Sequence, residues 1–367
     1  MSENRIHRPY RVMQVMAGAP VGGIETFFFD ALLALSEAGL EQVAVVRPNA
    51  KYQIERLESA GIRVVKTAFS PWFIFPSWAA LAREVATFKP DIIQYWTGRA
   101  AMTAVRSSAV EVGWYGGYRD RWRFGSCSDF IGITHDLVQH IRRQGVPAEH
   151  IALVHTFADL RPSEPLDRRE FSTPADVPLL LALARLHVDK GLDLLLSALA
   201  NVPKAHLWIA GEGPERAALV DQMNQLNLSQ RVRFLGWRVD REALLATADI
   251  CVFPSREEPF GTVTIEAWAA GTPLIAAAAQ GPAAYVENER NGLLVPINDV
   301  DALADAIARL VSDTALRQEL AIHGREDYER NFTKEIYVRD MRSFYDRLAQ
   351  RAASDQFGPD HHAASVQ

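Results

Sequence analysis

The sequence of 367 residues is poor in cysteine, because only Cys127 and Cys251 occur and they lie far apart. They lack the close spacing of a metal-binding motif, and so sparse a cysteine content favours a reducing compartment. The polar start MSENRIHRPYR has no apolar segment of the kind found in secretory signals. We therefore expect a cytoplasmic protein.

Long apolar runs are also missing, since no stretch approaches the roughly 18 uncharged apolar residues of a membrane span. Any contact with a membrane is therefore expected to be peripheral. No basic block occurs and the net charge is −6, which argues against nucleic acid as a partner. What is present is a globular composition, 48% hydrophobic and 23% charged, in a chain whose length favours two domains.

Short apolar runs alternate with amphipathic stretches along most of the chain, as in RVMQVMA followed by GIETFFFDALLALSEAG. This alternation predicts parallel sheets covered by helices on both faces. It fails in the proline-rich and charged stretch FADLRPSEPLDRREFSTPADV and then restarts. We expect two α/β domains, 1–157 and 178–332, joined by a linker, 158–177. A helix over 333–350 and a disordered tail, 351–367, complete the prediction.

The stretch PSREEPFGTVTIEAWAAGTP, residues 254–273, places two carboxylates, Glu258 and Glu266, around the start of a predicted helix. The apolar run DICVFPS before it predicts a strand, and ligands collect at the carboxyl ends of parallel strands. The first N–H groups of a helix suit an anion, and Gly261 would let backbone approach a ligand closely. The expected anion site is the backbone of Phe260, Gly261 and Thr262.

Carboxylates accept hydrogen bonds from the vicinal hydroxyls of a ribose or a sugar, which gives Glu258 and Glu266 a binding role. An equally simple interpretation makes Glu258 a solvated loop acid and Glu266 an acid that favours a helix start.

Two cations follow the first predicted strand of the second domain, in ALARLHVDKGLDLL. Arg185 ends this strand and Lys190 begins the next helix, so together they could clamp a diphosphate, although ordinary surface cations would look the same. In the first domain, Gly22 and Gly23 precede a helix and would let a phosphate or sugar approach. Their spacing does not match the dinucleotide pattern G-x-G-x-x-G.

The combined motifs resemble the large retaining glycosyltransferase family 4, the group 1 glycosyltransferases. The resemblance rests on GGIE, RLHVDKGLDLLLSA, IAGEGPE, VRFLGW, ICVFPSREEPFGTVTIEAWAAGTPLIA and NGLLVPINDVDALADAI, and covers nearly the whole chain. It implies the GT-B fold, in which two Rossmann-like parallel-sheet domains face each other across a cleft. The final helix, 333–350, would cross back to the first domain.

The family resemblance also assigns roles to residues. Arg185 and Lys190 would hold the diphosphate of a UDP- or GDP-linked sugar without a metal or cofactor, and Glu258 would contact the transferred sugar. Glu266 would bind the ribose, and Trp237 would lie by the base. Gly23, with Gly22, would line the diphosphate from the first domain. The acceptor would be a glycan or lipid-linked molecule in bacterial lipopolysaccharide, capsule or exopolysaccharide synthesis, at the cytoplasmic face of the inner membrane.

One departure concerns the first domain, where many family members carry a histidine that contacts the donor sugar. The corresponding stretch EVGWYGGYRDRWRFG has none. Tyr115 or Tyr118 is a candidate substitute, and Arg119 a candidate contact for an anionic acceptor. The opposite interpretation is an ordinary helix with solvated arginines and core tryptophans.

Two other functions remain open at the level of sequence. Sugar-nucleotide 2-epimerases share the two-domain architecture, and a non-catalytic binder of nucleotides or glycans would need the same donor pocket. An epimerase would change the donor without an acceptor, which distinguishes it from a transferase.

Overall fold

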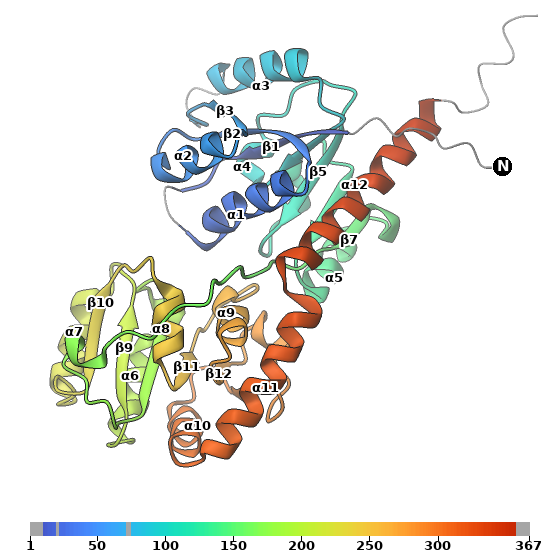
Figure 1. Cartoon of the computed structure of the whole chain (residues 1–367). Coiled ribbons are helices and arrows are strands. Elements are labelled where there is room, and N and C mark those ends of the chain that lie inside the picture. The colour runs from blue at the N-terminus through green and yellow to red at the C-terminus, as the bar shows by residue number, and fades with distance from the viewer. Residues whose placement is uncertain (1–9, 20–21, 71–74, 357–367) are drawn as a thin grey trace, which may run out of the picture. The chain divides into compact units, whose positions relative to one another are not determined.

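The computed structural model describes residues 10–19, 22–70 and 75–356, and the chain divides into two compact units. The first unit is Met1–Thr156 together with Glu335–Gln367, and the second is Phe157–Lys334. Figure 1 shows a sheet in each unit with helices packed around it. The expectation of two parallel-sheet α/β domains is therefore confirmed.

The sheet of the first unit has seven parallel strands in the order β3-β2-β1-β4-β5-β6-β7. Its central strands are almost entirely buried, as expected where helices cover both faces. The strands are β1 Arg11–Met16, β2 Glu41–Val46, β3 Arg63–Lys66, β4 Ile92–Tyr95, β5 Val110–Tyr115, β6 Asp129–Gly132 and β7 Ile151–Leu153. The helices are α1 Gly23–Glu37, α2 Lys51–Ser59, α3 Phe75–Phe88, α4 Gly98–Ala101, α5 His135–Arg143 and α12 Lys334–Gln356, with short 3-10 turns η1 Arg121–Phe124 and η2 Ala148–His150.

The sheet of the second unit has six parallel strands in the order β10-β9-β8-β11-β12-β13. The strands are β8 Leu179–Leu183, β9 His206–Ala210, β10 Val232–Gly236, β11 Ile250–Phe253, β12 Leu274–Ala277 and β13 Leu293–Val295. The helices are α6 Leu192–Ala200, α7 Arg216–Gln225, α8 Arg241–Thr247, α9 Thr262–Ala270, α10 Val300–Ser312 and α11 Thr314–Asn331, with turns η3 Arg168–Phe171, η4 Val188–Lys190 and η5 Pro282–Ala284.

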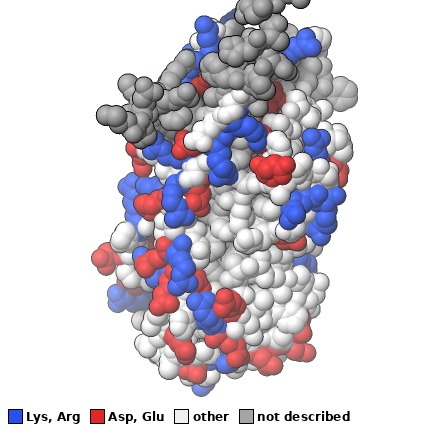
Figure 2. Space-filling view, turned by 90° about the vertical axis from the view of Figure 1, so that its right-hand side faces the viewer, with Lys and Arg blue, Asp and Glu red and all other residues white. Residues whose placement is uncertain are grey.

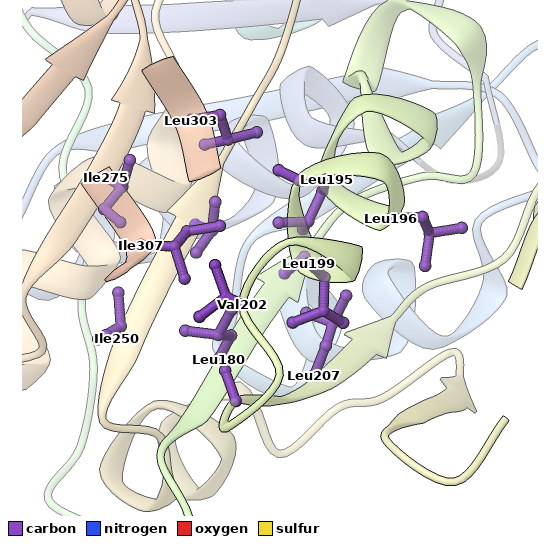
Figure 3. Close-up of a cluster of buried hydrophobic side chains, with 14 of the residues drawn as sticks. Leu180, Leu195, Leu196, Leu199, Val202, Leu207, Ile250, Ile275, Leu303 and Ile307 are labelled. Atoms are coloured by element: carbon purple, nitrogen blue, oxygen red, sulfur yellow. The ribbon is translucent and has the colours of Figure 1, made fainter. Parts of the chain in front are cut away.

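The core of the second unit lies between its sheet and the helices α6 and α10. Figure 3 shows Leu195 and Leu199 from α6 beside Leu180 of β8 and Leu207 of β9, with Ile307 from α10 among them. All five side chains are fully buried. This packing fixes the strands whose carboxyl ends carry the candidate site.

Residues 158–177, expected to be a linker, lie within the second unit. The Arg168 guanidinium donates to the backbone oxygen of Val177 at 3.0 Å and pairs with Asp249 at 3.0 Å. The Trp208 indole N–H donates to the Thr173 hydroxyl at 2.9 Å. These side-chain contacts depend on tertiary structure and leave no pattern in the sequence.

The helix interpretation of residues 111–125 is wrong, because Val110–Tyr115 forms strand β5 in the middle of the first sheet. Gly113 is needed there, since a β-carbon at this position would lie 2.9 Å from the rings of both Phe124 and Phe130. The run of arginines that follows lies around the short turn η1 and not on a helix face.

Helix α12 belongs to the first unit from Glu335 on, and it continues to Gln356, beyond the expected end at 350. The Tyr345 hydroxyl donates to Gln94 Oε1 of β4 at 2.7 Å, and Gln14 Nε2 of β1 donates to the same hydroxyl at 3.2 Å. Arg351 forms an ion pair with the buried carboxylate of Asp129. The rest of the expected tail, 357–367, lies outside the described residues.

Among the described helices, none combines the length and the apolar composition needed to cross a bilayer. On the face seen in Figure 2, basic and acidic side chains are interspersed.

Candidate active site

The candidate site of the second unit lies where the direction of chain progression across the sheet reverses. Strands β8 and β11 are parallel neighbours, while β9 and β10 extend to one side and β12 and β13 to the other. Loops that follow β8 and β11 leave the sheet at this reversal, which is where ligands bind in open α/β sheets. The first loop carries Arg185 and Lys190, and the second carries Glu258.

Lys190 and Glu258 meet directly, although 68 residues separate them in the sequence. The ammonium Nζ lies 2.5 Å from Glu258 Oε2, and the two side chains are only 22% and 17% exposed. A partly buried ion pair of this kind orients each side chain toward the other. Arg185 is exposed at the end of β8, and its guanidinium forms no ion pair with any residue that the structure describes.

Arg256 ties the two loops together. Its guanidinium forms a bidentate pair with Asp193 at 2.8 and 2.7 Å and donates to the backbone oxygen of Val188 at 2.7 Å. Its backbone N–H donates to Asp189 O at 2.7 Å. Burial alone would raise the pKa of Asp193, but the hydrogen bonds and charge of Arg256 outweigh it and lower that pKa. No sequence motif marks Arg256 as part of the site.

The start of α9 is shaped by Gly261, whose φ of 89° lies in the left-handed region that favours glycine. A β-carbon there would lie 2.8 Å from the Phe253 ring and 3.2 Å from Glu258 Cγ. The Phe260 side chain is buried, so this residue offers only its backbone, whose oxygen accepts a hydrogen bond from the Tyr285 hydroxyl. Thr262 opens the helix, whose first N–H groups lack intrahelical partners.

Glu258 is fixed at its backbone as well, because its carbonyl oxygen accepts a hydrogen bond from Gly281 N at 2.7 Å. Gly281 packs so closely on Phe260 that a β-carbon would lie 2.2 Å from the Phe260 oxygen. The loop bearing the first acid is thereby held to the loop that follows β12.

Glu266, the second acid, lies in α9 with a side chain that is 10% exposed. Its Oε1 is 3.0 Å from Arg241 Nη1 at the start of α8. No sequence signal marks Arg241, because only the packing of α8 against α9 brings it to Glu266. Trp237, four residues before Arg241 and just after β10, is 59% exposed.

In the first unit, Gly22 caps α1 and Gly23 is its first residue. The Glu25 carboxylate turns back over this loop, where Oε1 accepts a hydrogen bond from Ala19 N at 2.7 Å. A β-carbon on Gly22 would lie 2.2 Å from Glu25 Oε2, whereas one on Gly23 would meet nothing within 4 Å. A ligand could therefore approach the backbone closely at Gly23. Both glycines follow β1, which neighbours β4 at the reversal point of this sheet.

The acceptor-side candidates do not form one group. Tyr115 is fully buried and its ring stacks on Phe124 at 4.6 Å, so the suggestion that it contacts a substrate is wrong. The Tyr118 hydroxyl donates to Asp136 at 2.5 Å, and the exposed Arg119 follows it. Trp122, in the turn η1, is 66% exposed and lies under the Arg123 guanidinium.

Comparison with known proteins shows the family to which this chain belongs. The profile of the family described as "Glycosyl transferases group 1" matches residues 163–327, which include every candidate of the second unit. The "Lipopolysaccharide core biosynthesis glycosyltransferase LpsD" of Rhizobium meliloti (strain 1021) is 32% identical over 341 residues, which is 92% of this chain and 98% of that protein. The chain belongs to the group 1 glycosyltransferases.

Two further similarities agree with this assignment. The R. meliloti "Lipopolysaccharide core biosynthesis glycosyltransferase LpsE" is 32% identical over 318 residues, 86% of this glycosyltransferase and 93% of the relative. The crystal structure of Anabaena Alr3699/HepE in complex with UDP and glucose superimposes with a TM-score of 0.77 at 22% identity, covering 95% and 99% of the two chains. The expected GT-B fold class is confirmed by this likeness and by the two parallel sheets.

Proposed function

We propose that this glycosyltransferase moves a sugar from a UDP- or GDP-linked donor to a glycan or lipid-linked acceptor in bacterial lipopolysaccharide synthesis. The observation that carries the proposal is the Lys190–Glu258 pair beside the start of α9. The names of the two R. meliloti relatives support the pathway, and the UDP and glucose bound by the Anabaena protein support the donor class. Capsule or exopolysaccharide synthesis would use the same site.

In the proposed complex, Lys190 and the exposed Arg185 neutralise the diphosphate, which is the leaving group of the reaction. Lys190 then exchanges part of its contact with Glu258 for phosphate oxygens, and Glu258 accepts hydrogen bonds from the transferred sugar. The backbone of Phe260, Gly261 and Thr262 steadies the sugar and the phosphates, and Glu266 accepts from the ribose hydroxyls. Trp237 lies by the base, and Gly22 and Gly23 contribute from the first unit.

The proposed reaction retains the anomeric configuration. The acceptor oxygen attacks the anomeric carbon on the face that the diphosphate leaves, and the departing phosphate oxygen takes the acceptor proton. Positioning and positive charge supply most of the rate acceleration, so the reaction needs no strong base and no metal.

On the acceptor side, we propose that Arg119 binds an anionic group and that the exposed Trp122 packs against an apolar or sugar face. Tyr118 orients this loop through its hydrogen bond to Asp136. A lipid-linked acceptor would bring the enzyme to the cytoplasmic face of the inner membrane by peripheral contact.

The test begins with a thermal-shift panel of UDP, GDP, ADP and CMP, followed by their sugar conjugates. A ligand at about 100 times its dissociation constant stabilises the fold by roughly 2.7 kcal/mol. Glu258→Gln and Lys190→Ala should each lower the transfer rate at least about tenfold, equivalent to about 1.4 kcal/mol of barrier.

Lys204→Ala, at an exposed lysine of the same unit, is the matched control and should keep the wild-type rate. Full activity of both site variants would refute the assignment. A donor that is converted without any acceptor would instead favour the epimerase, and binding without turnover would favour the non-catalytic binder.

A further inference from the structure

Arg241 stands beside the carboxylate that the proposed function assigns to the ribose. The distance from its Nη1 to Glu266 Oε1 is 3.0 Å, which is shorter than the 3.8 Å from its Nε to Glu242 Oε1. Arg241 comes from α8 and Glu266 from α9, so the pair joins two helices that follow different strands.

Glu266 needs a cation where it lies. Its side chain is 10% exposed, and its neighbours in α9, Ile265 and Ala267, are fully buried. The thiol of Cys251 in β11 is fully buried, and its pKa is raised first by burial and then by the charge of Glu266. A carboxylate in such surroundings stays ionised and fixed in direction only when a positive partner is close.

The charged form of Glu266 is the form that could recognise a ribose. An ionised carboxylate only accepts hydrogen bonds and can take one from each of two vicinal hydroxyls, whereas a protonated one loses part of that capacity. Arg241 can supply both charge and direction, because a guanidinium is permanently charged and planar.

We propose that Arg241 is a positioning residue that holds Glu266 ionised and aimed, and thereby sets the preference of the site for ribonucleotides over 2′-deoxyribonucleotides. This inference rests on the proposed function, because it requires a nucleoside diphosphate at the site. The inference adds Arg241 to the proposed donor pocket, and it adds discrimination at the 2′ position of the ribose.

The experiment is calorimetric titration of the full-length protein with UDP, GDP and ADP, and then with the 2′-deoxy form of whichever binds most tightly. In the wild type, loss of the 2′ hydroxyl should weaken binding by roughly tenfold or more, because a buried acceptor loses its donor. In Arg241→Gln the ratio of the two dissociation constants should fall to about threefold or less, since Glu266 is no longer held.

Three further variants separate positioning from a general effect on the fold. Arg241→Lys restores a charge without the planar fork and should recover part of the preference. Adding Arg241→Gln to Glu266→Gln should leave the ratio of the single Glu266→Gln variant unchanged, because the two residues act as one unit. Arg309→Gln removes an exposed arginine that pairs with Glu289, and should keep the wild-type ratio.

The outcomes are distinct. If Arg241→Gln keeps the wild-type ratio of the two dissociation constants, for example by weakening both ligands equally, the inference is wrong. Wild-type binding would then still support the proposed function. If the wild type binds none of the nucleotides, the proposed function and this inference fall together.

Discussion

Single residues in the second unit determine which charges a ligand meets. Lys190 and Glu258 neutralise each other at 2.5 Å, and Arg241 pairs with Glu266 at 3.0 Å. Arg185 is an exposed cation in the same loop as Lys190. In the proposed complex, a diphosphate would add two or more negative charges to a site with one exposed arginine, Arg185, and one lysine, Lys190, that can exchange its partner. The exchange keeps each acid close to a positive group, and so avoids leaving an isolated buried charge.

Arg256 offers a prediction at this scale, because it touches neither Lys190 nor Glu258 but fixes the loops that carry them. Arg256→Ala removes the bidentate pair with Asp193 and the contact with Val188. The free energy of unfolding should fall by about 1 kcal/mol, and nucleoside diphosphate affinity by roughly tenfold. Urea unfolding and calorimetry measure the two quantities. Unchanged affinity in a folded Arg256→Ala protein would show that the loops hold their geometry without this clamp.

The residues could be predicted from sequence to the extent that they lie in one continuous motif. Glu258 and Glu266 share a strand-to-helix stretch, and Lys190 follows a strand in the same manner, so local pattern and family resemblance made all three candidates. Arg241 and Arg256 act through partners that are distant in sequence or on another helix, and their pairing exists only after the strands assemble. Tyr115 was misjudged because a single tyrosine in a glycine-rich stretch carries no signal of its burial.

At the scale of elements, the two parallel sheets were predicted from the sequence, but the edge strands β7 and β13 were not. Short apolar runs followed by amphipathic stretches, such as those of β1, β8 and β11, predict buried strands. Strands β7 and β13 have three residues each, which is too short for a period to be recognised. Strand β5 was difficult to predict because Gly113 lies inside it and Gly116 follows it. Its aromatic residues are equally compatible with a helix and with a buried strand.

Helices α9 and α11 are linked through a polar contact that predicts a pH effect. The Trp268 indole of α9 donates to Asn291 O at 2.8 Å, while Asp327 Oδ2 of α11 accepts from Asn291 Nδ2 at 2.8 Å and Arg290 Nη1 at 2.7 Å. Burial would raise the pKa of Asp327, but hydrogen bonds from Arg290 and Asn291 outweigh it, and the pKa lies below its usual 3.8. The ionised form is therefore stabilised by folding.

The pKa of Asp327 is lower in the folded than in the unfolded protein. Its contribution to the free energy of unfolding is therefore complete above the unfolded-state pKa and is lost as the pH falls through the folded-state pKa. Asp327→Asn should lower the free energy of unfolding by about 1–3 kcal/mol at neutral pH. The difference from wild type should shrink below about pH 4. Urea unfolding of both proteins across this range tests the sign, and a difference that stays constant into strong acid would contradict it.

At the scale of the whole molecule, the chain returns to its first unit after completing the second. The residues of α12 that face this unit include Tyr337, Met341, Phe344, Tyr345 and Leu348, all 3% exposed or less. Tyr345 also closes a buried network with Gln14 and Gln94. The first unit is thus completed by the C-terminal helix α12, whereas the second unit is continuous in sequence.

Removal of residues 335–367 tests this dependence. Burying one large apolar side chain contributes about 1.5–3 kcal/mol, so the five of α12 together amount to about as much as the whole stability of a domain, about 5–15 kcal/mol. We expect the shortened chain to lose the cooperative thermal transition of the first unit and to keep that of the second, as measured by calorimetry. Removal of residues 357–367 alone leaves α12 intact and should preserve both transitions. Two native transitions in the longer deletion would mean that the first sheet is stable without its last helix, and that α12 is attached to it rather than part of its core.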